Sequence, residues 1–126
     1  MRATFSQIFV LLFSLLALSP LHSYADEPVK LAIEVDIRGG FVGFDTPAFA
    51  TVRAVMASLI MDGTLAHWIT TSRGMEGGGT YCMQFHPEFI SRKSRVLAQF
   101  QNIHVNEVST AYSVRELERC EIPALK

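Results

Sequence analysis

Apolar residues in this 126-residue chain follow two spacings, one typical of strands and one typical of helices. The order of the segments with these spacings restricts the fold more than any other feature. Over residues 30–38 apolar and polar side chains alternate, which is typical of a strand with one buried and one solvated face. Over residues 46–60 the apolar side chains recur at steps of three and four, as on an amphipathic helix. Thr46 and Pro47 predict the N-cap and first turn of this helix, and Asp62-Gly63 predicts its end.

Two β-rich segments, a second helix and a last strand follow. Leu65–Thr71 and Thr80–His86 flank the glycine-rich Ser72–Gly79, which predicts a hairpin with a long tip. Pro87 then opens the second helix, and Val105–Val114 is expected to form the last strand. The basic residues of the second helix are expected to stay in solvent: Arg92, Lys93 and Arg95.

The resulting order is strand, helix, strand, strand, helix, strand within about 85 residues. This order predicts an α+β domain with the ferredoxin-like βαββαβ sandwich, in which two helices cover one face of a four-stranded antiparallel sheet. The other face of the sheet stays open. Since Tyr81, Met83 and Phe85 share the side that faces the helices, we expect Cys82 to project from the open face.

The first 25 residues have the features of a secretory signal peptide. Arg2 supplies the positive charge, Ile8–Leu18 the apolar stretch, and Ser23-Tyr24-Ala25 the small residues before a cleavage point. The alternative is a membrane anchor, but eleven helical residues span about 16 Å, roughly half of a hydrocarbon core. We therefore expect cleavage after Ala25, a single domain over residues 26–126, a periplasmic or secreted location, and no membrane association after cleavage.

The charge balance excludes two classes of protein. Without Met1–Ala25 the chain has ten basic and twelve acidic residues. Such a balance does not provide the excess of Lys and Arg with which proteins neutralise phosphates, so no nucleic-acid partner is expected. It is equally unlike an acid-rich, aromatic-poor disordered tail.

The two cysteines, Cys82 and Cys120, are expected to form a structural disulfide in an oxidising compartment. A redox pair would favour the close C-x-x-C spacing, which these residues lack. Because Cys120 lies in the segment 115–126, the bridge would tether this C-terminal tail across the open face of the sheet.

Two glycine-rich segments each allow two interpretations. In 38–44 the phenylalanines either cap the core between the first strand and the first helix or form a recognition loop on a rigid scaffold. In 73–79 the glycines form either a hairpin tip without a ligand or a binding loop with an apolar anchor. The candidate partner-binding residues are Arg38, Gly39, Gly40, Phe41, Phe44, Arg73, Met75 and Glu76.

The alternating strand followed by Gly39-Gly40-Phe41-Val42-Gly43 resembles the N-terminal signature of the emfourin-type inhibitors of thermolysin-like metalloproteases. The resemblance covers about a dozen residues and implies an inhibitory role for this end of the chain. The glycine-rich hairpin, the cysteines and the last strand lie outside the pattern, so the resemblance assigns no interface residues beyond Gly39–Gly43.

A second motif, Gln84-Phe85-His86-Pro87-Glu88, resembles a segment of the class I glutamine amidotransferases, whose Cys-His-Glu triad would include His86 and Glu88. Cys82 cannot serve as its nucleophile, because residues 82 and 86 of one strand lie about 13 Å apart. We expect no enzymatic activity. The scattered histidines, His67, His86 and His104, lack the spacing of a metal site, so neither a metal nor a cofactor is expected.

Together these features predict a small exported, non-catalytic binding protein. We expect a protein partner, with the chain acting as an inhibitor or immunity-type partner of a secreted hydrolase or protease. One alternative is the binding of a small ligand on the open sheet face by Glu34, Gln84 and His86. A further alternative is an unrecognised small enzyme, for which Glu34 and Asp36 form a carboxylate pair about 7 Å apart on one strand.

Overall fold

The computed structural model describes residues 26–74 and 77–122. The expected signal peptide, and with it the cleavage after Ala25, lies outside the described residues, as do the candidate loop residues Met75 and Glu76. The elements in chain order are β1 (Ala32–Gly39), α2 (Thr46–Met61), β2 (Leu65–Ser72), β3 (Gly78–Phe85), η1 (Pro87–Phe89), α3 (Ile90–Gln101) and β4 (Thr110–Leu117).

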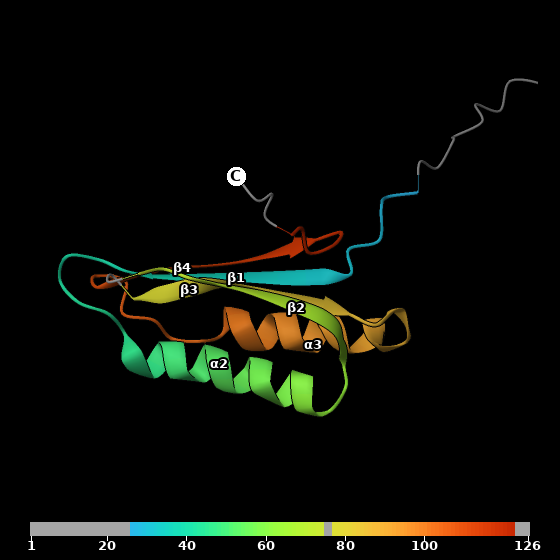
Figure 1. Cartoon of the computed structure of the whole chain (residues 1–126), viewed down its shortest axis with the longest axis horizontal. Helices are drawn as coiled ribbons and strands as arrows, with labels where there is room; N and C mark the ends of the chain where they lie inside the picture. Colours follow the sequence, from blue (N-terminus) through green and yellow to red (C-terminus); the bar gives the residue numbers. More distant parts are fainter. Residues whose placement is uncertain (1–25, 75–76, 123–126) are drawn as a thin grey trace, which may run out of the picture.

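The four strands form one antiparallel sheet in the order β2-β3-β1-β4. Both helices lie on the same face of this sheet, and the other face is open (Figure 1). The strand order and the helix placement confirm the predicted ferredoxin-like sandwich. Within the described ranges, no helix has the length and apolar character needed to cross a bilayer.

The core lies between the helices and the sheet. Ile33, Val35 and Ile37 of β1 are fully buried there, as the alternation of this strand predicts. The apolar stripe of α2 meets them through Val52 and Leu59, and α3 contributes Val96 and Phe100. Burial of these side chains supplies the main driving force for folding.

Three local predictions need correction. Asp45, not Thr46, caps α2, because its side chain accepts the N–H of Ala48. The last strand begins at Thr110 rather than at Val105, since Asn106 forms a turn that ends in a hydrogen bond from the Thr110 N–H to the Asn106 carbonyl. Lys93 is buried, because its ammonium forms an ion pair with Glu116 on β4.

The disulfide joins Cys82 of β3 to Cys120, which follows β4, and confirms the predicted tether. The chain after β4 therefore passes over β1 to reach β3 on the open face. There Cys82 and Cys120 form a small buried cluster with Ala32, against which Ile69 and Leu117 pack. Cys82 thus lies on the open face, as expected from the alternation of β3.

Candidate functional site

Three loops gather at one end of the sheet (Figure 1). They are residues 40–45 between β1 and α2, the described part of the β2–β3 tip, and residues 102–109 between α3 and β4. Backbone hydrogen bonds join them, because the Gly39 N–H donates to the Gly77 carbonyl (3.3 Å) and the Gly40 N–H donates to the Ser109 carbonyl (2.9 Å). We call these three loops the loop end. The structure thus places both candidate binding segments of the sequence side by side.

The β1–α2 loop projects two apolar side chains from a tight turn. Gly40 and Gly43 exchange backbone hydrogen bonds of 3.1 and 3.2 Å, which leaves Phe41 and Val42 as its two central residues. Gly43 has a φ of 132°, a conformation that L side chains rarely adopt. Phe41 is fully exposed and Val42 nearly so. An exposed phenylalanine on a two-residue turn contributes nothing to the core of the domain.

The two phenylalanines of this loop have different surroundings. Phe44 packs edge-on against Phe49 of α2, with the ring centroids 5.1 Å apart, and contributes to the core. Phe41 makes no such contact and lies in solvent. The core-capping interpretation therefore holds for Phe44, whereas Phe41 has the exposure that a recognition loop requires.

Asp45 anchors the base of the turn. Its carboxylate accepts the backbone N–H groups of Ala48 (3.0 Å) and Asn106 (2.8 Å), and these two hydrogen bonds hold its pKa below the usual value. The Asp45 N–H in turn donates to the Thr110 hydroxyl at 2.8 Å. The loop end is therefore tied to α2 and to β4. The turn at Asn106 also exposes Val108, an apolar residue that the expected strand Val105–Val114 would place on the same side as Tyr112 and Val114.

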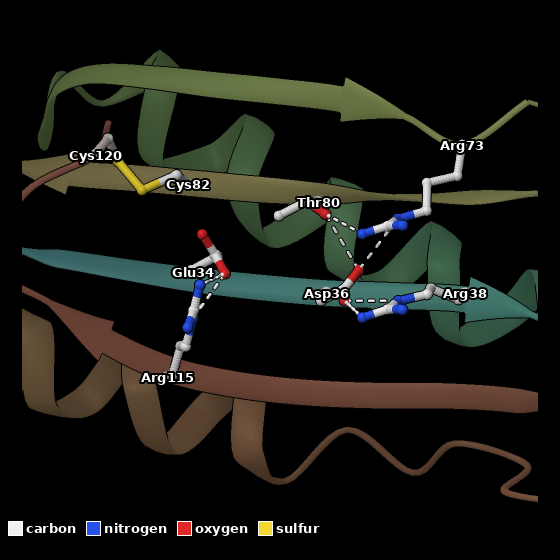
Figure 2. A network of polar contacts seen from close by, with 8 residues as sticks. All are labelled: Glu34, Asp36, Arg38, Arg73, Thr80, Cys82, Arg115 and Cys120. Carbon is white, nitrogen blue, oxygen red and sulfur yellow. Dashed lines mark hydrogen bonds and ion pairs between the residues drawn. A yellow bond between two sulfur atoms is a disulfide. The ribbon is translucent and has the colours of Figure 1, made fainter. Parts of the chain in front are cut away.

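Asp36 connects the two candidate binding segments on the open face beside the loop end (Figure 2). Arg38 forms an ion pair with the Asp36 carboxylate, and the hydrogen bonds of this pair raise the pKa of Arg38. Arg73 lies 3.7 Å from the other carboxylate oxygen, and the Thr80 hydroxyl donates to the same oxygen at 3.2 Å. Two arginines share one carboxylate here, so this group of three side chains carries one net positive charge.

A second feature of the open face is a hollow of about 470 Å³ beside the tail that the disulfide tethers. Glu34 lies in its wall and forms an ion pair with Arg115 of β4 at 2.7 Å (Figure 2). The lining residues are Glu34, Cys82, Arg115, Leu117, Glu118, Arg119 and Glu121.

The other two residues predicted to bind a ligand on this face do not line the hollow. Gln84 uses its side-chain oxygen to accept the Cys120 N–H at 3.1 Å, so it holds the tail in place. His86 follows β3 and lies edge-on to Phe89, with the ring centroids 6.3 Å apart. This hollow therefore includes Glu34 but neither Gln84 nor His86 in its wall.

The candidate catalytic and metal-binding groups are dispersed or engaged. Glu34 and Asp36 share the open face of β1 as expected, and each is paired with arginine. Among the described residues, no group of three or more His, Cys, Asp or Glu side chains is close enough to hold a metal ion.

Comparison with known proteins finds no matching family model, curated protein or solved structure.

Proposed function

We propose that this domain is an exported, non-catalytic binding protein that inserts the Phe41-Val42 turn into an apolar cleft of a protein partner. The observation that carries the proposal is the full exposure of Phe41 at the tip of a turn whose base is hydrogen-bonded to three neighbouring segments. Binding residues are commonly presented in this way, on loops held by a rigid scaffold.

The energetics of the turn favour this role. Burying a phenylalanine side chain in a partner gains about 1.5–3 kcal/mol. Because the glycine pair and Asp45 already hold the turn in one conformation, little ordering entropy is lost on binding. Arg38 and Arg73 lie beside the turn, where their guanidinium groups would pair with carboxylates of the partner.

The partner class that we propose is a secreted hydrolase, and specifically a thermolysin-like metalloprotease. The resemblance of Gly39–Gly43 to the emfourin-type inhibitors supports this choice, because these residues form the turn and the strand end that precedes it. The disulfide supports an oxidising compartment, where such proteases act.

The test is an inhibition assay with the purified protein, expressed from the full-length sequence. It is titrated against a thermolysin-like metalloprotease and, for comparison, a serine protease, with a peptide substrate. We expect inhibition of the metalloprotease. Phe41→Ala should weaken it by about 10- to 150-fold, which corresponds to the lost burial of one aromatic side chain.

Met61→Ala is the matched control, since Met61 is an apolar residue 88% exposed at the far end of α2. It should leave the inhibition constant unchanged. Equal inhibition by the Phe41→Ala and Met61→Ala variants would refute the role of the turn. Failure of the wild-type protein to inhibit the metalloprotease would refute the proposed partner class.

The hollow on the open face supports a second candidate function, the binding of a small charged ligand. Glu34, Arg115 and Arg119 supply charges of both signs around a space of about 470 Å³. A thermal-shift screen with amino acids and dicarboxylates tests it. A stabilising ligand should lose its effect in the Glu34→Gln variant but not in Phe41→Ala.

A further inference from the structure

The free edge of β2 has backbone groups that the sheet does not use. β2 pairs with β3 on one side only, at the end of the strand order. The Arg73 N–H donates to the Gly78 carbonyl, and hydrogen-bonded pairs alternate along an antiparallel ladder. The residues at the alternate positions, Trp68, Thr70 and Ser72, therefore direct their N–H and C=O groups away from β3.

This edge lacks the charged residues and prolines by which many proteins discourage strand pairing, and its register shift, between Leu65 and His67, lies at the start of the strand. The sequence of β2, Leu-Ala-His-Trp-Ile-Thr-Thr-Ser, contains no Lys, Arg, Asp, Glu or Pro. Such residues are the usual protection of an exposed edge. The opposite edge, β4, carries Arg115 and Glu116. An edge of eight uncharged residues is thus an open template for a further strand.

The helix beside this edge, α2, is also poor in charged residues. α2 has one charged residue, Arg53, among its sixteen. Between α2 and β2 lies a groove of about 440 Å³, whose wall includes Phe49, Met56 and Trp68. Arg53 extends over the Phe49 ring, 5.7 Å from its centroid. Trp68, the single tryptophan of the chain, is 45% exposed in this groove.

We propose that β2 and the adjoining side of α2 form the interface between two copies of this chain. The β2 strands pair antiparallel about a two-fold axis at Thr70, so that Thr70 lies opposite its counterpart and Trp68 lies opposite Ser72 of the other copy. This pairing joins the two sheets into one continuous sheet with all helices on the same face. This proposal is independent of the loop end.

A second copy fits this edge better than other partners do for two reasons. A two-fold axis brings the same surface of each subunit together, so a strand must be compatible with itself. β2 meets this condition, because no formal charge lies opposite a like charge in the paired strands. The two-fold axis also directs each Trp68 toward the groove of the other copy.

The dimensions are sufficient for a dimer. Eight strand residues span about 27 Å and sixteen helical residues about 24 Å, so the two layers form a wall of matched length. With a depth of about 20 Å for a sheet and a helix, its footprint is about 500 Å². Two such walls together bury about 1,000 Å², which reaches the lower bound for a biological interface and is smaller than the roughly 800 Å² per partner of standard-size ones.

Sedimentation velocity of the purified protein tests the proposal, at concentrations up to about 100 µM because dimerisation follows mass action. The wild type should sediment as a dimer. Thr70→Lys places two positive charges near the axis and should give a monomer with an unchanged circular dichroism spectrum. Ser113→Lys introduces the same charge at an exposed position of the opposite edge strand and should leave the dimer intact.

Amide hydrogen exchange locates the interface. In the wild type the N–H groups of Trp68, Thr70 and Ser72 should be protected, and in Thr70→Lys those of Trp68 and Ser72 should exchange at least about tenfold faster. A monomeric wild type, or a dimer that survives Thr70→Lys, would overturn the proposal. So would β2 amides that become protected only when an extended peptide is added, because the edge would then bind a peptide strand.

Discussion

Replacing both Cys82 and Cys120 with alanine removes the covalent link between β3 and the tail that follows β4. The bridge closes a loop of sequence separation 38. In the chain-entropy model such a loop lowers the entropy of the unfolded chain by about 13 cal/mol/K, which stabilises the native state by about 4 kcal/mol at 25 °C. A domain of this size has a total stability of about 5–15 kcal/mol, so the expected loss is a large share of it.

The structure indicates that the loss exceeds the entropy of the loop alone. Both sulfur atoms lie in the buried cluster with Ala32, and the Cys120 N–H is held by the Gln84 side chain. Once the tail is untethered, this hydrogen bond and the packing of Leu117 also weaken. We expect the free energy of unfolding to fall by about 4–5 kcal/mol, which lowers the melting temperature by more than about 15 °C.

Urea denaturation followed by tryptophan fluorescence measures this change, since Trp68 is the single tryptophan and β2 pairs with β3. Reduction of the wild type should reproduce most of the loss, and a reductant should have no effect on the double variant. A double variant within about 1 kcal/mol of the oxidised wild type would refute this account of the tether.

Three further predictions test the core and the turns. Glu116→Gln leaves the buried Lys93 without its carboxylate and should cost about 1–2 kcal/mol, less than for a fully buried pair because Glu116 is partly exposed. The hydrogen bond from Lys93 lowers the pKa of Glu116 below its usual 4.5. In urea denaturation the wild type should therefore be more stable than the variant above pH 4.5, and this difference should shrink as the pH falls through the lowered pKa. Burial raises the pKa of Tyr112 from 10.0 to about 12, so the wild type should lose stability between pH 10 and 12, and Tyr112→Phe should lack this part of the loss in thermal melts. Gly78→Ala should lower the free energy of unfolding by more than about 3 kcal/mol in urea titrations, because φ is 96° and a Cβ would overlap a carbonyl of β1. Gly63→Ala, at φ 74° in open space, should lower it by about 1 kcal/mol. Equal losses in the two variants would contradict the overlap.

Patterns that repeat over many residues predicted the fold correctly. The alternation of β1 placed Ile33, Val35 and Ile37 toward the helices, and all three are fully buried there. The same argument, applied to β3, placed Cys82 on the open face. These predictions succeed because burial of one face acts on every second residue, so a single exception does not change the result.

The periodicity of apolar residues does not predict interactions between residues that are distant in the sequence. Asp45 and Thr46 are both good N-caps by type, and the structure shows Asp45 as the cap, with a second hydrogen bond from the distant Asn106 N–H that local sequence does not indicate. Lys93 was expected in solvent, since the sequence does not indicate that β4 brings Glu116 to it. Likewise the sequence left the place of Phe41 open, and only the Gly40–Gly43 bridge makes it the tip of a turn.

The place of β1 in the middle of the sheet has a consequence for the timing of folding. Ala32 pairs with Gln84 on one side and with Leu117 on the other, so both neighbours of this strand lie much later in the chain. A chain that emerges N-terminus first from the ribosome must leave the backbone groups of one edge of β1 unpaired until β3 has appeared, and those of the other edge until β4 has appeared. Pairings between such distant segments form slowly, and the waiting chain is prone to aggregation. Truncations near β4 should therefore abolish folding rather than shorten the sheet by one strand.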